Sequence, residues 1–199
     1  MDIYKTLLRP SAETLFKEKN SKFFGYAFPA ASEDDVKNYL SILRKKHPGA
    51  GHFCYAYQIG TDNISFRAND DGEPGNSAGM PIYGQIQSFG LTNVLVCVVR
   101  YFGGVKLGVG GLMSAYKAAA QMTLEGAEII EKTIDIHYTL LFDYKNLNKV
   151  MRIIKERKLE IISQKMDLNC EIEIATPRQN AEEVSKAFRP IFEVTIKRP

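Results

Sequence analysis

An acidic, glycine-bearing segment holds the residues best suited to chemistry. It places three carboxylates within four positions: Asp70, Asp71 and Glu73. Their oxygens could hold a hard cation such as Mg²⁺, accept hydrogen bonds from a base edge, or pair with the lysines and arginines of a partner. The structural interpretation, which we favour, is an acidic turn whose aspartates bond the backbone of their own loop. The spacing excludes an EF-hand.

A second segment, between a β-branched run and an alanine-rich run, is built around glycine. Five glycines stand within nine positions: Gly103, Gly104, Gly108, Gly110 and Gly111. Such a segment leaves backbone N–H groups uncovered at the start of a helix, which suits phosphate or carboxylate, and Arg100 and Lys106 would add positive charge. The alternative is a turn that lets a strand and a helix pack closely. The spacing matches neither a P-loop nor a dinucleotide fingerprint.

His52 begins a strand-like run that leads to the acidic segment. A structural role is the favoured interpretation for a lone histidine, and no catalytic triad can be assigned.

The three cysteines, Cys54, Cys97 and Cys170, are far apart and lie in apolar runs. They are typical of buried thiols in a reducing cytosol, and not of disulfides or zinc ligands.

Residues 145–158 form a strongly basic segment in which Glu156 is the only acidic residue. Its basic residues are Lys145, Lys149, Arg152, Lys155, Arg157 and Lys158. We interpret the segment as the solvated face of a helix. The alternative is a surface that faces RNA or phosphate, with Lys145, Lys149, Arg152 and Lys155 as the contact residues.

The elements that must position these residues can be predicted in order. Ser32, followed by three acidic residues and an apolar stripe, predicts the start of a helix that ends before Pro48. The further predicted elements are strands at 52–59 and 64–68, a short helix from about Asn76, a strand at 93–101 that is buried on both faces, and a helix at 112–125.

From residue 132 the pattern changes to β-α-β-β-α-β, the ferredoxin-like order. Fourteen of the fifteen glycines lie between Gly49 and Gly126 and none lies beyond. We therefore predict an α+β protein of two domains, residues 1–130 and 131–199.

Composition narrows the function classes. The chain has 199 residues, of which 45% are hydrophobic and 25% charged, as in ordinary globular proteins. We expect no membrane helix and no secretory signal, because no apolar run approaches about 20 residues and the N-terminus lacks a basic, then apolar stretch. The net charge of +3 is too small to identify a nucleic-acid binder by itself.

The motifs together closely resemble the signature of the IMPACT/YigZ family. The matching motifs are Asp70-Asp71-Gly72-Glu73-Pro74, Ala78-Gly79-x-Pro81, Val98 to Gly108 and Gly110-Gly111-Leu112, with His52 and Ala56-Tyr57 before them. The resemblance covers roughly residues 10–125, and the rest is similar in pattern to the family's bacterial C-terminal module. It implies a first domain with the β-α fold shared by a small-subunit ribosomal protein and GHMP kinases. It also implies a second domain like the last domain of elongation factor G.

The resemblance implies a cytosolic protein that is connected with translation through RNA or ribosome binding, without established catalysis and without a cofactor. In this hypothesis the acidic and glycine segments form one cleft, and residues 145–158 extend the contact surface. Eukaryotic members carry a further N-terminal domain, for which we expect no room here. The alternatives are a phosphoryl-transfer or nucleotide-binding enzyme that uses the glycine segment with Mg²⁺ on the acidic segment, and a protein-interaction module around His52.

The chain departs from the family pattern at three places. Gly75-Asn76-Ser77 stands where the family commonly has Ser-Gly-Thr. Met80 and Ser114 stand where a basic residue is frequent. Two expected positive charges are therefore missing near the predicted site.

Overall fold

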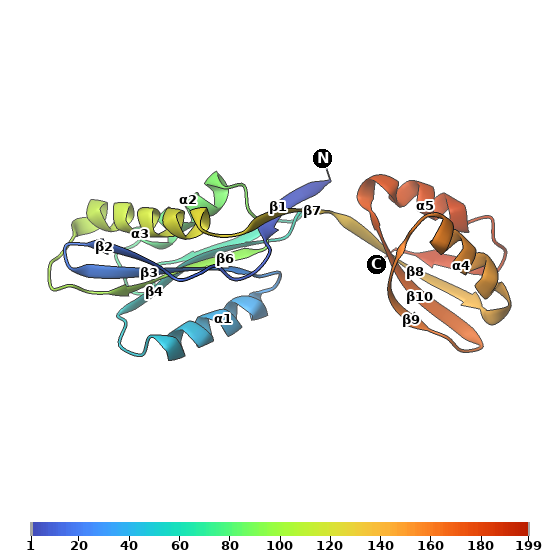
Figure 1. Ribbon diagram of the computed structural model, residues 1–199, viewed down its shortest axis with the longest axis horizontal. Helices are drawn as coiled ribbons and strands as arrows, with labels where there is room; N and C mark the ends of the chain where they lie inside the picture. The colour runs from blue at the N-terminus through green and yellow to red at the C-terminus, as the bar shows by residue number, and fades with distance from the viewer. Residues whose placement is uncertain (1, 199) are drawn as a thin grey trace. The chain divides into compact units, whose positions relative to one another are not determined.

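The structure is a computed structural model that describes residues 2–198 (Figure 1). The chain divides into two compact units, one of residues 4–132 and one of residues 2–3 and 133–198. Both units mix α-helices and β-strands, so the predicted α+β class is confirmed. Within residues 2–198, no helix is long and apolar enough to span a membrane.

The first unit is built on a five-stranded antiparallel sheet in the order β2-β3-β6-β4-β5. Its strands are β2 (Thr14–Glu18), β3 (Ser21–Pro29), β4 (His52–Ile59), β5 (Ser65–Asn69) and β6 (Val94–Tyr101). The central strand, β6, is buried from Val94 to Arg100, which confirms the predicted strand with two covered faces. A further two-stranded sheet, β1 (Ile3–Leu7) with β7 (Ile129–Thr133), was not predicted.

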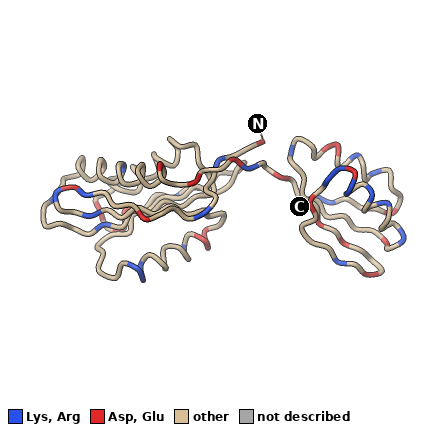
Figure 2. The backbone as a smooth tube through the Cα atoms, in the orientation of Figure 1, with Lys and Arg blue, Asp and Glu red and all other residues tan. Residues whose placement is uncertain are grey.

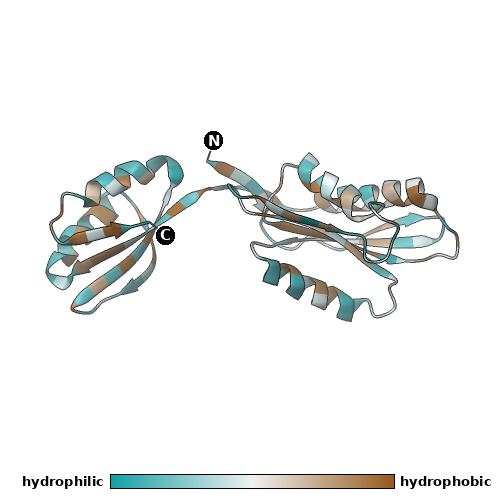
Figure 3. Cartoon of the chain, turned by 180° about the vertical axis from the view of Figure 1, so that it is seen from behind, coloured by the Kyte–Doolittle hydropathy of each residue, from teal (hydrophilic) through white to brown (hydrophobic). Residues whose placement is uncertain are grey.

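Helices cover both faces of this sheet. α1 (Glu33–Lys46) lies on one face, and α2 (Gly79–Ser88) and α3 (Gly108–Glu125) lie on the other (Figure 1). Side chains of β6 alternate between the two cores, as successive residues of a strand must. In Figure 3, α1 is mostly hydrophilic in colour, whereas α2 and α3 are paler.

α1 begins where the sequence predicts. The Ser32 hydroxyl accepts a hydrogen bond from the Asp35 N–H, and the Asp35 carboxylate accepts one from the Ser32 N–H. Such a capping box contributes about 1 kcal/mol. The Ser32 hydroxyl is the largest cause that lowers the pKa of Asp35, and the backbone N–H groups of Ala31 and Ser32 lower it further.

Two helices on the other face begin at unexpected positions. The predicted short helix near Asn76 begins instead at Gly79 and runs for ten residues. α3 begins at Gly108, not at Leu112. Its first turn is composed of glycine and valine, whose low helix propensity hides it in the sequence.

The second unit has the predicted element order β-α-β-β-α-β. Its elements are β8 (Asp135–Asp143), α4 (Leu147–Glu156), β9 (Glu160–Lys165), β10 (Asn169–Pro177), α5 (Ala181–Phe188) and β11 (Val194–Lys197), with single 3₁₀ turns at Tyr144–Asn146 and Arg178–Asn180. The antiparallel sheet has the order β11-β8-β10-β9. Apolar side chains of both helices cover one face of it and form a core of their own.

The C-terminal end of α1 is fixed by a buried histidine. His47 Nε2 lies 2.5 Å from the Tyr26 hydroxyl and Nδ1 lies 3.1 Å from the Tyr101 hydroxyl. Tyr26 in turn donates to the Glu13 carboxylate. Burial lowers the pKa of His47, so the folded protein favours the neutral imidazole.

We expect this histidine to make stability depend on pH. As pH falls below about 6.5, the unfolded chain binds a proton at His47 before the folded chain does, so the free energy of unfolding decreases until the folded pKa is reached. Urea unfolding between about pH 7.5 and pH 5.5 measures this slope. His47→Gln should flatten it, and an unchanged slope in that variant would contradict the assignment.

Candidate ligand-binding site

Asp70 is a structural cap for α2. Its Oδ1 accepts hydrogen bonds from the N–H groups of Ala78 (2.9 Å) and Gly79 (2.8 Å), and its Oδ2 accepts one from Asn76 (2.8 Å). The N–H groups of Ala78 and Gly79 stand at the start of α2, where donors have no intrahelical partner. The negative charge also lies at the favourable end of the helix dipole. Asp70 therefore acts within its own loop, as the structural interpretation proposes.

Asp71 joins the acidic loop, which contains Asp70, Asp71 and Glu73, to two other elements. Its Oδ2 accepts a hydrogen bond from the Phe53 N–H in β4 at 2.7 Å, and its Oδ1 pairs with Arg44 of α1 at 3.1 Å. Its backbone carbonyl accepts a hydrogen bond from Nδ1 of His52 at 2.8 Å. Asp71 thus fixes the acidic loop beside the first residues of β4.

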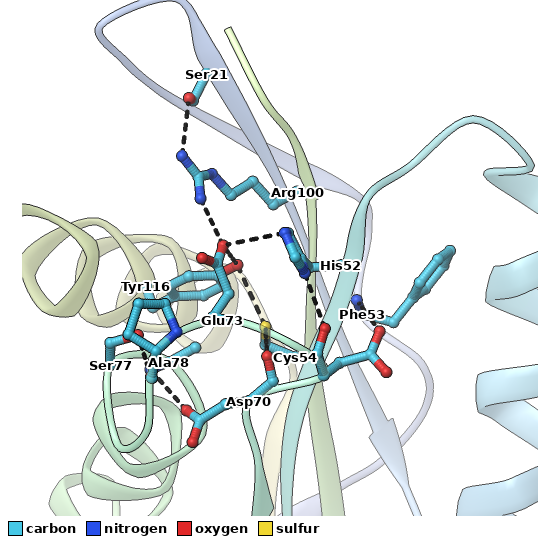
Figure 4. Close-up of polar contacts among 12 residues, drawn as sticks. Ser21, His52, Phe53, Cys54, Asp70, Glu73, Ser77, Ala78, Arg100 and Tyr116 are labelled. Carbon is cyan, nitrogen blue, oxygen red and sulfur yellow. Dashed lines mark hydrogen bonds and ion pairs between the residues drawn. The ribbon is translucent and has the colours of Figure 1, made fainter. Parts of the chain in front are cut away.

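Glu73 forms a buried ion pair with Arg100, the residue that precedes the last of β6 (Figure 4). Arg100 Nη1 lies 2.6 Å from Glu73 Oε1, and the Tyr116 hydroxyl of α3 donates to the same oxygen at 2.7 Å. The two charged side chains are only 4% and 6% exposed. Glu73 of the acidic loop therefore contacts both β6 and α3, the two elements on either side of the glycine loop (residues 103–111).

Arg100 is held further by Ser21 and by aromatic rings. Its Nη2 lies 3.4 Å from the Ser21 hydroxyl, and its guanidinium carbon lies 5.4 Å from the centre of the Phe23 ring and 5.5 Å from that of Phe102. Its Nε is buried without a hydrogen-bond partner among the residues that the structure describes. The proposed role of Arg100 as a free positive charge for a ligand is therefore not supported by its surroundings.

His52 directs its second ring nitrogen toward this site. Nδ1 donates to the Asp71 carbonyl, so Nε2 is an acceptor whenever the ring is neutral. Nε2 lies 4.0 Å from Glu73 Oε1, and the side chain is 27% exposed. The arrangement can accept a hydrogen bond from a ligand at the edge of the buried pair.

The predicted Mg²⁺ ligands do not converge. Asp70 faces the start of α2, Asp71 faces β4 and α1, and Glu73 faces Arg100. Within residues 2–198, no three His, Cys, Asp or Glu side chains are placed to hold a metal ion. The carboxylates of the acidic loop therefore do not fit a magnesium site.

Cys54 lies beneath the ion pair and is fully buried. Its Sγ is 3.0 Å from the Asp70 carbonyl oxygen and 3.2 Å from the Tyr116 hydroxyl. Burial is the largest cause that raises the pKa of its thiol far above the usual value. Cys97 and Cys170 are also free and buried, so the prediction of unpaired buried thiols is confirmed.

We expect Cys54 to be inert in the native protein. Raising the pH from about 7 to about 9 should not accelerate its alkylation as it does for an exposed cysteine, because the thiolate does not form. Mass mapping of iodoacetamide labelling, with and without urea, measures this. Labelling of native Cys54 at the rate of the unfolded chain would contradict it.

The glycines of the glycine loop have different roles. A Cβ at Gly103 would lie 2.1 Å from the backbone of Asn20, so this glycine serves close packing. Gly104 and Gly108 adopt left-handed φ angles of +84° and +73°, which favour glycine. Gly110 has open space where a Cβ would stand and no positive φ, so the fold itself does not require glycine there.

The first turn of α3 is exposed and has no side-chain cap. Its N-cap residue, Leu107, makes no capping hydrogen bond, and the turn contains no acidic residue. Gly110 and the neighbouring Lys106 are exposed. This surface offers free N–H groups, the positive end of a helix dipole and an ammonium group, which together suit an anion.

The predicted contact residues of the second unit are partly engaged. Lys145 pairs with Asp143 at 3.5 Å and also with Glu193, and Arg152 lies 3.7 Å from Glu156. Lys149 and Lys155 are exposed. In Figure 2, both signs of charge are interspersed over this unit, which favours the solvated face over a continuous basic surface.

The sequence interpretation missed Tyr116, Ser21 and Arg44. A buried tyrosine requires a partner for its hydroxyl. Tyr116 lies within the apolar face of an alanine-rich helix, and this was the available signal that it bonds a polar group. Ser21 and Arg44 gave no signal, since they are far in sequence from the residues they contact.

Comparison with known proteins shows the family to which the chain belongs. A family model described as the Impact N-terminal domain matches residues 19–124. The chain is similar to an IMPACT family member of Haemophilus influenzae, with 32% identity over 89% of this chain and 88% of that protein. It is also similar to YigZ of Escherichia coli, with 30% identity over 84% and 83%. A crystal structure described as that of an hypothetical protein superposes with a TM-score of 0.77 at 26% identity, over 98% of this chain and 97% of that one. The chain therefore belongs to the IMPACT family.

Proposed function

We propose that this chain is a cytosolic, non-catalytic protein of translation that binds the phosphates of structured RNA, free or in the ribosome. The observation that carries the proposal is the exposed, uncapped first turn of α3 beside Lys106. Phosphate is bound at helix starts by free backbone N–H groups, without sequence specificity. The link to translation and the cytosol comes from the IMPACT family resemblance.

The neutralised acidic loop supports this proposal. The Asp70 carboxylate is surrounded by three backbone N–H groups, Asp71 pairs with Arg44, and Glu73 pairs with Arg100. The loop therefore repels a nearby phosphate much less than its composition suggests. In this proposal Asp70, Asp71 and Glu73 position the start of α2 and the end of β6, and the α3 turn makes the contact.

The proposal also assigns a fold type to each of the two domains. Residues 1–130 would be the IMPACT-type domain with the ribosomal-protein and GHMP-kinase type of fold. Residues 131–199 would be a ferredoxin-like domain, in which the exposed Lys149 and Lys155 add a weaker contact to RNA.

A salt titration tests the proposal. The full chain should bind structured RNA and purified ribosomes at about 50 mM salt and lose affinity steeply by about 200 mM, because phosphate contacts release counterions. Binding that is insensitive to salt, or absent at low salt, would overturn it. Heat on titration with millimolar Mg-ATP would instead favour the nucleotide-binding alternative.

A further inference from the structure

Three large apolar side chains are exposed together at one end of the second unit. Leu168 and Phe192 are each 83% exposed, and Tyr144 is 59% exposed. We call these three residues the apolar tip. They lie outside the hydrophobic core of the unit, so their apolar character does not serve folding. Exposed apolar side chains that gather at one end of a domain mark an interaction site more often than scattered ones do.

The apolar tip is fixed by the sheet. β10 pairs Asn169 with Asp143, and β11 pairs Val194 with Phe142. Tyr144 directly follows β8, Leu168 directly precedes β10, and Phe192 lies two residues before β11. The Tyr144 N–H donates to the Leu168 carbonyl at 3.1 Å, and the Asn146 side chain lies 3.5 Å from the Phe192 carbonyl. The three residues therefore lie at the ends of neighbouring strands, at the same edge of the sheet.

Each residue of the apolar tip has an acidic neighbour in the chain: Asp143, Asp167 and Glu193. A cavity of about 650 Å³ beside Leu168 is also lined by Asp143, Asp167, Glu171 and Glu193, with Lys165 as the one basic residue of its lining. Lys145 pairs with Asp143 and Glu193, and the Glu193 contact is the largest cause that raises its pKa. Four carboxylates and two ammonium groups therefore lie at or near this end of the unit. The surroundings are acidic, in contrast to the net positive charge of the chain.

We propose that the apolar tip binds a basic protein surface of the ribosome, one with an apolar pocket bordered by lysine or arginine. This inference rests on the proposed function, which supplies the ribosome as the partner. It adds a contact with ribosomal protein to the contact that the first turn of α3 makes with RNA. The charge of the residues near the apolar tip decides the class of partner. The carboxylates near the tip outnumber the ammonium groups by two, so this net negative charge disfavours RNA phosphates and anionic lipid headgroups and complements a basic protein rim. Aromatic and leucine side chains filling a pocket supply the apolar part of such an interface.

Site-specific photo-crosslinking tests the proposal. A photoreactive phenylalanine analogue at position 192 of the full chain is irradiated with purified ribosomes at low salt. The expected product resists nuclease, is degraded by protease and contains a ribosomal protein with a basic surface. The control carries the analogue at Phe66, which is 52% exposed in the first unit, and should give much less product. Crosslinks to ribosomal RNA, crosslinks to a second copy of the chain, or a yield no higher than the control would overturn the proposal.

A double variant separates this inference from the proposed function. Leu168→Ser with Phe192→Ser should weaken ribosome binding about tenfold and leave the affinity for free structured RNA unchanged. The matched control is Leu8→Ser with Ile64→Ser, at residues that are 52% and 55% exposed, and it should bind as the original chain does. Equal ribosome affinity of the two double variants would overturn the role of the apolar tip. Failure of the original chain to sediment with ribosomes would overturn the proposed function and its partner together.

Discussion

Replacing Arg100 with methionine is expected to reduce the free energy of unfolding by about 3–5 kcal/mol. The loss of stability comes from Glu73, the partner that remains in the variant. Glu73 is 4% exposed and receives hydrogen bonds from Arg100 and Tyr116, so removal of the guanidinium leaves a buried carboxylate with one neutral donor. Small domains are stable by only about 5–15 kcal/mol, so this loss is a large fraction of the total. Urea unfolding followed by far-UV circular dichroism measures it.

A double-mutant cycle makes the expectation specific to the pair. Glu73→Gln alone should also be costly, because it leaves Arg100 buried and charged beside a neutral amide. The variant with both Glu73→Gln and Arg100→Met should be clearly more stable than the sum of the two losses predicts, since no uncompensated charge remains and the new amide oxygen can still accept from Tyr116. Additive losses, or single losses below about 1 kcal/mol, would show that the pair does not stabilise the fold in this way.

Local patterns explain why much of the first unit could be predicted. Ser32 with its acidic first turn predicts the start of α1, and the β-branched run at 93–101 predicts a strand with two covered faces, which is β6. Both signals depend on residues that are neighbours in sequence. The same holds for the turn between β4 and β5, whose bounds differ from the prediction by one residue at most.

The candidate site required distances that no local pattern contains. Glu73 contacts an arginine 27 positions away and a tyrosine 43 positions away. The sequence interpretation left open whether the acidic loop holds a cation or bonds its own backbone. The structure favours the second, because Asp70 lies against the first N–H groups of α2, a helix whose start the sequence predicted three residues too early. The start of α3 was hidden for a related reason, since glycine weakens the helical pattern.

Replacing Gly110 with aspartate is expected to abolish most RNA binding while leaving the fold intact. A Cβ at this position meets no atom within 4 Å, and an acidic side chain in the first turn of a helix is favourable to the helix dipole. The variant should therefore be as stable as the original chain or more so. A bound phosphate at the same turn would meet a like charge, so affinity for structured RNA should fall at least about tenfold at low salt.

The control is Gly110→Asn, which has nearly the same shape and no charge. If free N–H groups and the dipole of α3 attract phosphate, the asparagine variant should keep most of the affinity, and its dependence on salt should match that of the original chain. In the aspartate variant, the slope of log affinity against log salt concentration should become shallower by about one, the loss expected for one phosphate contact. Lys106→Ala should produce a similar loss of slope with a smaller loss of affinity. The two side chains have nearly the same shape and differ in charge. Equal affinities of the aspartate and asparagine variants would therefore mean that no phosphate lies near position 110 and that RNA binds elsewhere on the chain.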